Sequence, residues 1–413
     1  MFAATTVRAV NDLTARWARD AVGEQGTALT AAGLWPLLAL LAGPADGPAR
    51  KELAEAVGVE AEDAVREASA LLAALTAADG VDAALGLWTQ RVLELRPEWR
   101  DSLPLDVHGE LTGDARADQA ALDAWAQRHT DGLIERMPVR AGADILLVLA
   151  SALLVRTTWT DRFQEFPLRP DEGFWAGREL TGLSRIRRDP EEIRVHRTPA
   201  GALTAAEVAG DNGLDVHLLL GPADMPGGEV LRHGVAALGG AYPVVSGTAL
   251  SDGVGPGVQV RTVTSFDDRP IVKLKCVGFT VDAEHDLLER AQLFGLATAT
   301  HAARGHFPGI SPQPLAVSSA RQTVTATFNA LGFRAAAVTA VGMRAGAVPR
   351  KESQMVTVTF QRPFGFLAVH RESGLVLVAG WVTDPDRWSG RPQRRFEGRP
   401  RPAGVGRGPA ASR

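Results

Sequence analysis

The chain has 413 residues, of which 45% are hydrophobic and 22% are charged, a composition typical of a globular protein with a sizeable buried core. The formal net charge of -4 gives no general signature of nucleic-acid or membrane binding, so we expect neither kind of partner. Cys276 is the only cysteine, which excludes an intrachain disulfide and any metal site made of several cysteines.

The N-terminus and the apolar runs give no sign of export or membrane insertion. Residues 1–8 lack a basic segment followed by an apolar one, and the runs at 34–42 and 145–155 are too short to cross a bilayer. We therefore expect a soluble, cytoplasmic monomer. Heavy alanine and glycine usage and scarce lysine suggest a GC-rich bacterial genome, since lysine occurs only at Lys51, Lys273, Lys275 and Lys351.

The first third of the chain is predicted to be mainly helical. Residues 7–22 carry apolar side chains at helical spacing. Residues 34–41 are apolar on every side, which predicts a buried helix with Pro36 tolerated in its first turn. Further helices are expected at 48–57 (closed by Gly58), at 61–78 and at 118–136.

Strand patterns dominate the rest of the chain. Residues 81–90 alternate, and 145–155 form a nearly continuous apolar run, typical of a central strand buried on both faces. Because helices come first and strands follow, the pattern indicates an α+β protein rather than repeated βαβ units. Other strands are expected at 203–208, 215–220, 271–274, 279–281, 324–328, 355–360, 366–370 and 375–382.

Residues 332–340 form a run of small side chains between two strand patterns, and residues 341–354 after it look irregular. Alanine-rich segments favour helix. Small residues with threonine and valine also suit a strand that must fit between two others. The local pattern leaves both structures open.

The C-terminal segment differs in composition from the rest. Residues 387–413 contain eight arginines and one acid, with many glycines and prolines, and cannot form a core. A solvated, disordered tail is preferred over an arm that binds anions. We therefore expect one domain at 1–386 and a tail at 387–413.

Motifs of catalysis and metal binding are absent. No nucleophile elbow, phosphate loop, zinc-protease motif or dinucleotide fingerprint occurs, and the glycine-rich stretch 253–257 lacks the required spacing. His301 and His306 are expected to be solvated loop residues rather than metal ligands, and the acidic pairs 191–192 and 267–268 to be exposed. We expect no enzymatic activity, cofactor or metal.

Several blocks of sequence, in a characteristic order, carry a resemblance to the serpin family of serine protease inhibitors. Residues 123–134 are similar to the family's helix with Trp-Val-x-x-x-Thr-x-Gly-x-Ile. Residues 147–154, followed by Trp159 and Phe163, are similar to its strand with Leu-x-Asn-Ala-x-x-Phe. The resemblance covers about residues 10–385, and its other blocks are 29–58, 307–311, 362–367 and 380–385.

The resemblance implies helices packed on a large central mixed β-sheet, with further smaller sheets and an exposed reactive-centre loop. In this family a protease cuts the loop, which then inserts into the sheet as an extra strand. Residues 341–352 are then the bait. The inserting hinge is assigned to Gly332, Phe333, Arg334, Ala335, Ala336, Ala337, Val338, Thr339 and Ala340.

The scissile bond is placed differently by two counts along the loop. Counting from the start of the hinge gives Gly346–Ala347, the preferred candidate, whereas counting back from the Pro-Phe block gives a site near 350–352. Small residues suit an elastase-like protease, whereas Arg344, Arg350 or Lys351 suit a trypsin-like one. The expected partner is therefore a serine protease of one of these two kinds.

The regions through which the loop enters the sheet, called the breach and the shutter, carry altered residues. Gln322 stands in place of a histidine, Thr30 and Gly33 in place of two serines, and Ser151 in place of an asparagine, while the resemblance assigns Trp159 to the breach. Gln322 and Ser151 both donate and accept hydrogen bonds, so they could rebuild a network there.

Phe333 stands where the family usually has threonine or serine, and Ala330 and Leu331 replace an acidic pair. Forcing the ring between packed strands would cost about 1–3 kcal/mol, whereas burying it in available space would contribute about 1.5–3 kcal/mol. The sequence leaves the sign open. We therefore predict a suicide-substrate inhibitor that acts by loop insertion, with a non-inhibitory serpin-fold binding or structural protein as the alternative.

Overall fold

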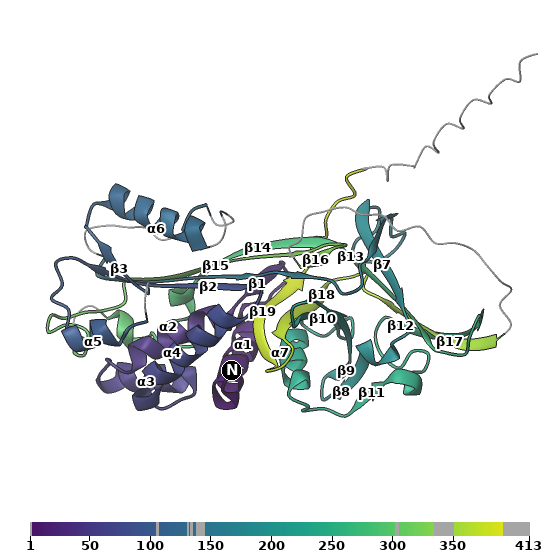
Figure 1. Ribbon diagram of the computed structural model, residues 1–413, viewed down its shortest axis with the longest axis horizontal. Coiled ribbons are helices and arrows are strands. Elements are labelled where there is room, and N and C mark those ends of the chain that lie inside the picture. The colour runs from purple at the N-terminus through teal and green to yellow at the C-terminus, as the bar shows by residue number, and fades with distance from the viewer. Residues whose placement is uncertain are drawn as a thin grey trace, which may run out of the picture.

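The computed structural model describes residues 2–104, 107–129, 132, 135–137, 145–301, 305–333 and 351–390. Helices and three β-sheets make up this part of the chain (Figure 1). The predicted α+β class is confirmed, because the helices form layers on the largest sheet and do not alternate with its strands.

The largest sheet has seven strands, with the order β3-β2-β4-β15-β16-β5 and β14 paired to β15. β4 and β15 run parallel and β2 runs antiparallel to β4, so the sheet is mixed. Its strands are β2 (Val81–Gln90), β3 (His108–Leu111), β4 (Leu147–Val155), β5 (Thr157–Thr158), β14 (Phe279–Asp286), β15 (Ser319–Phe328) and β16 (Gly332–Phe333).

β4 is buried on both faces, as its apolar run predicts. Leu147 and Leu149 belong to the main core, whereas Val148 and Ala150 join a smaller cluster that includes Trp125 of the helix α6. Successive side chains of a strand point to opposite faces, so this strand contributes to two cores at once.

Helices cover both faces of the large sheet. Figure 1 shows α1 to α4 on one face and α6 on the opposite face. The helices are α1 (Ala4–Ala21), α2 (Ala31–Ala42), α3 (Gly47–Val57), α4 (Ala61–Ala77), α5 (Pro97–Ser102), α6 (Ala115–His129) and α7 (Gly227–Leu238).

α2 is the buried helix expected from its sequence, but it begins earlier than predicted. Thr30 is its N-cap, and the Thr30 Oγ1 atom accepts a hydrogen bond of 3.1 Å from the Gly33 N–H. Pro36 therefore lies in the second turn and not in the first. The helix retains it there at the loss of one backbone hydrogen bond.

Two smaller sheets complete the fold. One has seven strands in the order β1-β19-β18-β10-β9-β8-β11, and the other has five in the order β12-β17-β13-β7-β6. The first contains β1 (Thr27–Leu29), β8 (Ile193–Thr198), β9 (Gly201–Ala209), β10 (Leu214–Leu220), β11 (Val244–Ser246), β18 (Phe364–His370) and β19 (Leu375–Val382). The second contains β6 (Gln164–Leu168), β7 (Leu180–Arg187), β12 (Val258–Ser265), β13 (Ile271–Val277) and β17 (Lys351–Thr359).

The helix predicted at 118–136 is shorter in the structure. α6 ends at His129, and Arg136 lies outside any helix. Gly132 has a φ of 76° and donates its N–H to the Gln127 carbonyl at 2.9 Å, a turn that ends the helix.

The start of β17 was also predicted wrongly, because 351–354 were expected to be irregular. β12, which the sequence reasoning missed, pairs antiparallel with β17 from Val258↔Val358 to Ser265↔Lys351. This neighbour extends β17 back to Lys351.

The predicted domain boundary at 386 stays a prediction. Beyond it, the Trp388 N–H donates to the Glu179 carbonyl at 3.1 Å, and residues 391–413 lie outside the described residues. No helix in the described ranges is both long and apolar enough to span a bilayer.

Candidate functional site at the opening of the large sheet

The large sheet has an opening between β4 and β15. The two strands pair only from Ser319↔Val148 to Gln322↔Ser151. Beyond these pairs, β15 continues to Phe328 and β4 continues to Val155 without further pairing between them. Their outer edges are bonded to β14 and β2, so two facing edges are left that an additional strand could join.

A buried hydrogen-bond network closes the opening at the end where the two strands last pair, at Gln322 and Ser151. We call this the lower end. Gln322 of β15 is fully buried, and its Oε1 accepts from the Thr30 N–H at 3.0 Å. Its Nε2 donates to the Thr30 carbonyl at 2.9 Å and to the Ser151 Oγ at 3.1 Å. One side-chain amide thus joins β15, the start of α2 and β4.

The network contains no ionisable side chain, and its nearest histidine is held by a different bond. His285 lies opposite Gln322 on β14, and its Nε2 contacts the Ala28 carbonyl at 2.8 Å. Burial lowers the pKa of His285, so this ring is neutral at pH 7.

At the opposite end of the opening, where β15 ends at Phe328, lie a tight turn and an aromatic layer. We call this the upper end. Asn329 Oδ1 accepts from the N–H groups of Leu331 and Gly332 at 2.9 and 3.2 Å, which turns the chain back on itself after β15. Trp159 donates its Nε1–H to the Asn329 carbonyl at 2.8 Å and its backbone N–H to the Leu331 carbonyl at 2.9 Å. The Phe163 N–H donates to the Ala330 carbonyl at 2.9 Å.

Phe328 is the centre of the aromatic layer beside this turn. Its ring is fully buried, and its centroid lies 4.8 Å from that of Trp159, 5.7 Å from Phe163 and 5.3 Å from Phe279. These rings fix the segment that holds the turn.

β16 brings the first two hinge residues into the large sheet. Gly332 pairs with Thr158 of β5, and Phe333 pairs with Thr157 of β5 on one side and with Phe328 of β15 on the other. Phe333 is 2% exposed, and its ring centroid lies 6.0 Å from that of Phe366. The fold has room for this ring, so its burial here is favourable by about 1.5–3 kcal/mol, while its effect on insertion stays a prediction.

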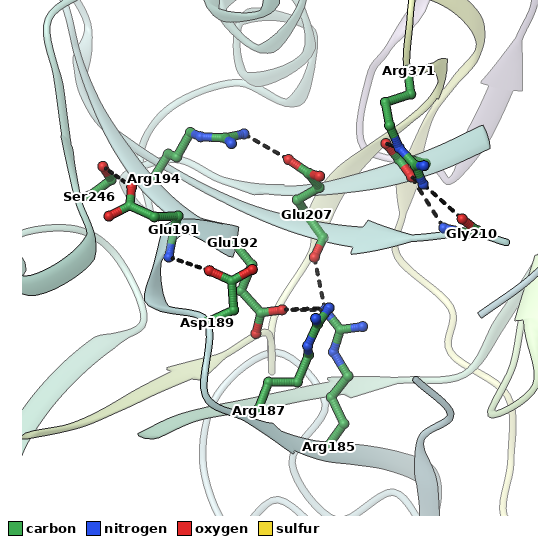
Figure 2. A network of polar contacts seen from close by, with 11 residues as sticks. Arg185, Arg187, Asp189, Glu191, Glu192, Arg194, Glu207, Gly210, Ser246 and Arg371 are labelled. Carbon is green, nitrogen blue, oxygen red and sulfur yellow. Dashed lines mark hydrogen bonds and ion pairs between the residues drawn. The ribbon is translucent and has the colours of Figure 1, made fainter. Parts of the chain in front are cut away.

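An ion pair lies next to the aromatic layer, between β7 and the single-turn helix Pro190–Glu192 (Figure 2). Arg185 donates from Nη2 to Glu192 Oε2 at 2.9 Å and to the Glu207 carbonyl at 2.8 Å. The two side chains are only 2% and 4% exposed. The Arg185 guanidinium carbon lies 5.1 Å from the centre of the Phe163 ring.

This arrangement corrects the expectation that Glu192 is exposed. Burial raises the pKa of Glu192 to about 7, against the opposing effects of Arg185 and Arg187. Arg187 contacts both Glu192, at 3.7 Å, and Asp161, at 3.3 Å. Sequence reasoning missed the site because Arg185 and Glu192 lie on different elements, and only the fold pairs them.

Comparison with known proteins identifies the family to which this chain belongs. The profile described as Serpin (serine protease inhibitor) matches residues 8–181 and 263–385. The chain belongs to the serpin family. Serpin-Z6C of rice (Oryza sativa subsp. japonica) is 24% identical over 409 residues, which cover 92% of this chain and 96% of the relative.

Solved serpin structures share the fold. Native protease nexin-1 with heparin superposes with a TM-score of 0.68 at 16% identity, covering 92% of this chain and 98% of that one. Thyroxine-binding globulin in complex with thyroxine gives 0.69 at 13% identity, covering 93% and 99%. Members of the family are typically inhibitors rather than enzymes, and they generally target proteases.

The predicted serpin sites are only partly within the described residues. Trp159, Ser151, Thr30 and Gln322 lie around the opening, as described above, while their roles in loop entry stay predictions. Hinge residues 334–340 lie outside the described residues. So do the preferred scissile bond Gly346–Ala347 and the alternatives Arg344 and Arg350.

Lys351, the last alternative for the scissile bond, is the first residue of β17 and pairs with Ser265. Glu352 also belongs to this strand, so the predicted bait region is shortened at its C-terminal end to residue 350. A protease needs an extended, accessible segment, and a residue paired within a sheet does not offer one.

Of the two loop histidines that were expected to be solvated, His301 is exposed but His306 is buried. His306 Nε2 donates a hydrogen bond to the His301 backbone carbonyl at 2.9 Å. Within the described residues, no group of three or more histidine, cysteine or acidic side chains could hold a metal.

Proposed function

We propose that this serpin inhibits a serine protease as a suicide substrate, with residues 341–350 as the bait and residues 332–340 as the inserting hinge. The observation that carries the proposal is β16. Gly332 and Phe333 are already sheet residues, and β16 runs antiparallel to β15, next to the opening between β4 and β15.

Insertion has an adequate driving force. A strand continuing from β16 would bond to the facing edges of β4 and β15 along the opening. Roughly ten new backbone hydrogen bonds, at a net of about 0.5–1.5 kcal/mol each, give on the order of 10 kcal/mol. The shutter network must break first, but its few hydrogen bonds are worth less than this gain.

The bait is compatible with two protease classes. Gly346 and Ala347 would fit the shallow primary pocket of an elastase-like enzyme, whereas Arg344 and Arg350 would fit the acidic pocket of a trypsin-like one. Since the loop can be cut at either kind of site, both enzymes belong in the first experiment.

A non-inhibitory binding protein is the second candidate. The altered shutter residues and the missing acidic pair before Gly332 favour it, because both depart from the family's pattern. Thyroxine-binding globulin, one of the similar structures, was solved with a small molecule bound. On this view the opening in the sheet never receives the loop.

The deciding experiment is incubation with a trypsin-like and an elastase-like protease, followed by denaturing gel electrophoresis. Inhibition predicts a covalent complex that survives denaturation, together with a sharp rise in the thermal midpoint of the nicked protein. Plain cleavage with an unchanged thermal midpoint would instead establish the binding role.

Two hinge variants distinguish trapping by loop insertion from plain cleavage of the loop. If the inserted strand continues the alternation that starts at Phe333, residue 337 faces the same buried side. Ala337→Glu would bury a charge and turn the inhibitor into a substrate that is cut without trapping. The conservative change Ala337→Val should still form the complex.

A further inference from the structure

The five-stranded sheet has one face packed on the core and one face exposed. On β13, Val272, Leu274 and Cys276 are buried, while Lys273 and Lys275 between them are partly exposed. Directly paired residues share a face, so the strand register assigns every position to one side or the other. We call the side of Lys273 and Lys275 the outer face.

Four cations lie on this outer face. Lys273 and Lys275 pair with Thr357 and Thr359 of β17, and Arg261 of β12 pairs with Met355, two positions earlier on β17. Lys351, at the start of β17, is exposed and is assigned to the same side by the register, while its neighbours on that side, Ser353 and Ser265, are buried. The face thus holds three of the chain's four lysines.

Acidic side chains are missing from the outward positions of these five strands. Glu165 of β6 and Glu352 of β17 are the acids within them, and both occupy positions of the opposite face. In a protein with a net charge of -4, strands with four cations and no acid at their outward positions are a local departure from the average surface, and the acids beside them are Asp267 and Asp268 in the turn next to Lys351. It produces a positive potential over the sheet.

Most of this charge is not neutralised by neighbours. In the described part of the chain, Arg261, Lys273 and Lys275 make no ion pair, and Lys351 contacts Asp268 at 3.6 Å with both side chains largely exposed. The positively charged surface extends past Lys275 to Arg362, since both side chains line a depression of about 720 Å³ at that end of β17.

Exposed apolar side chains accompany the cations. Ile186 of β7, which pairs with Lys273, is 60% exposed, and so is Phe266, the residue after β12. Mixed apolar and cationic surface is typical of a protein interface, whereas a flexible polyanion is bound mainly by charge. The partner indicated is a protein with acidic residues on its contacting surface.

The position of the outer face indicates that this partner is the protease that binds the bait. Lys351 follows directly on residue 350, the end of the shortened bait, and the sheet lies at the end of the molecule away from α3 and α6 (Figure 1). Neighbouring strands are about 4.8 Å apart and alternate residues about 7 Å apart, so Arg261, Lys273 and Lys275 lie within roughly 20 Å of one another. A protease bound to a bait that ends at residue 350 would therefore lie next to the end of this sheet.

We propose that the outer face of the five-stranded sheet is a secondary docking surface that pairs with an acidic patch beside the target protease's cleft. This inference rests on the proposed function. It adds that the chain prefers target proteases that carry an acidic patch beside the cleft. Charge complementarity of this sort acts mainly on the association rate and fades with salt.

The test is a triple charge reversal, Arg261→Glu, Lys273→Glu and Lys275→Glu, with two trypsin isoforms of opposite net charge. The readout is the second-order rate at which intact chain disappears, by trapping or by cleavage, at low and high salt. At low salt we expect at least a 10-fold fall for the acidic isoform, no fall for the basic one, and loss of the wild-type salt dependence.

The matched control makes the same change of charge elsewhere. Arg8 of α1, Lys51 of α3 and Arg116 of α6 are exposed and lie on other elements, so replacing all three by glutamate should leave the rates close to wild type. Thermal denaturation of both variants establishes that the fold is retained.

The outcomes separate this inference from the proposed function. A wild-type chain that is cleaved without trapping overturns the proposed inhibition, yet its cleavage rates still test the docking surface. Equal rates in the triple variant and the wild type overturn the docking surface alone, and so does an equal fall with both isoforms. Loss of binding to a sulfated polysaccharide without any change in these rates would reassign the face to a polyanion.

Discussion

The two ends of the opening in the large sheet are held by different physical means. At the lower end, Gln322 joins Thr30 and Ser151 through three neutral hydrogen bonds. At the upper end, rings pack around Phe328, next to the buried Arg185–Glu192 ion pair. The lower end is polar and uncharged, whereas the upper end is apolar with a titratable neighbour.

The difference indicates which end opens. Three hydrogen bonds at a net of about 0.5–1.5 kcal/mol each hold the lower end by only about 1.5–4.5 kcal/mol. They can be replaced by the bonds of an inserting strand. Large buried rings find no such replacement, so the upper end should keep its structure while the strand enters.

The largest effect is expected at the upper end, for Phe328→Ala. Removing this fully buried ring leaves a cavity among Trp159, Phe163 and Phe279, and should lower the free energy of unfolding by about 3–5 kcal/mol. Urea unfolding followed by tryptophan fluorescence measures the loss. Phe266→Ala, at a ring that is 60% exposed, should cost far less.

The pH dependence of stability should also come from the upper end. The pKa of Glu192 rises from 4.5 to about 7 in the folded protein, so the folded state holds a proton that the unfolded chain has released. The stability from this group is therefore complete below pH 4.5 and is lost as pH rises to 7. Each pKa unit corresponds to about 1.4 kcal/mol, so the loss is about 3 kcal/mol at most.

Two glutamine variants isolate this contribution. Glu192→Gln should remove the fall in the urea midpoint with rising pH that comes from this carboxyl, and leave the opposite slope of the buried histidines, whose pKa values are lowered by burial. The neighbouring Glu191→Gln should keep the wild-type slope, since Glu191 is exposed and accepts a hydrogen bond from the Ser246 hydroxyl at 2.8 Å. A slope in Glu192→Gln that is identical to the wild-type slope would assign the titration to another group.

At the lower end, Gln322→Ala should have a smaller effect. It leaves the Thr30 N–H, the Thr30 carbonyl and the Ser151 hydroxyl buried without these partners, which costs about 1–3 kcal/mol. The cost should not change between pH 5 and 8, because no member of the network titrates there. If the nicked Gln322→Ala variant has the same thermal midpoint as the nicked wild type, the network stabilises the protein only before the loop inserts.

Long periodic segments could be predicted from the sequence, and short exposed ones could not. The run that became β4 was found because both of its faces are apolar. β12 was missed because Val258–Ser265 alternates only loosely and is held by backbone pairing with β17, a strand nearly a hundred residues later. A one-dimensional pattern carries little information about such pairing.

Site residues divide in the same way. Gln322, Ser151 and Thr30 could be named together because a family resemblance supplied their meeting point, and the side-chain chemistry of Gln322 and Ser151 supplied the bonds. The burial of Phe333 depends on space beside Phe366, and the burial of Glu192 depends on Arg185 from another strand. Both needed the three-dimensional packing.

The smallest effect is expected for Ser151→Ala, which removes one of the three bonds of the lower network. The loss should be about 0.5–1.5 kcal/mol, because Gln322 Nε2 keeps its bond to the Thr30 carbonyl. A double-mutant cycle with Gln322→Ala then measures how the network holds together. If Gln322 anchors it, the double variant should be about as stable as Gln322→Ala alone, since Ser151 has already lost its partner. Fully additive losses would mean that Ser151 stabilises β4 independently, and the lower end would then consist of separate contacts rather than a unit that opens in one step.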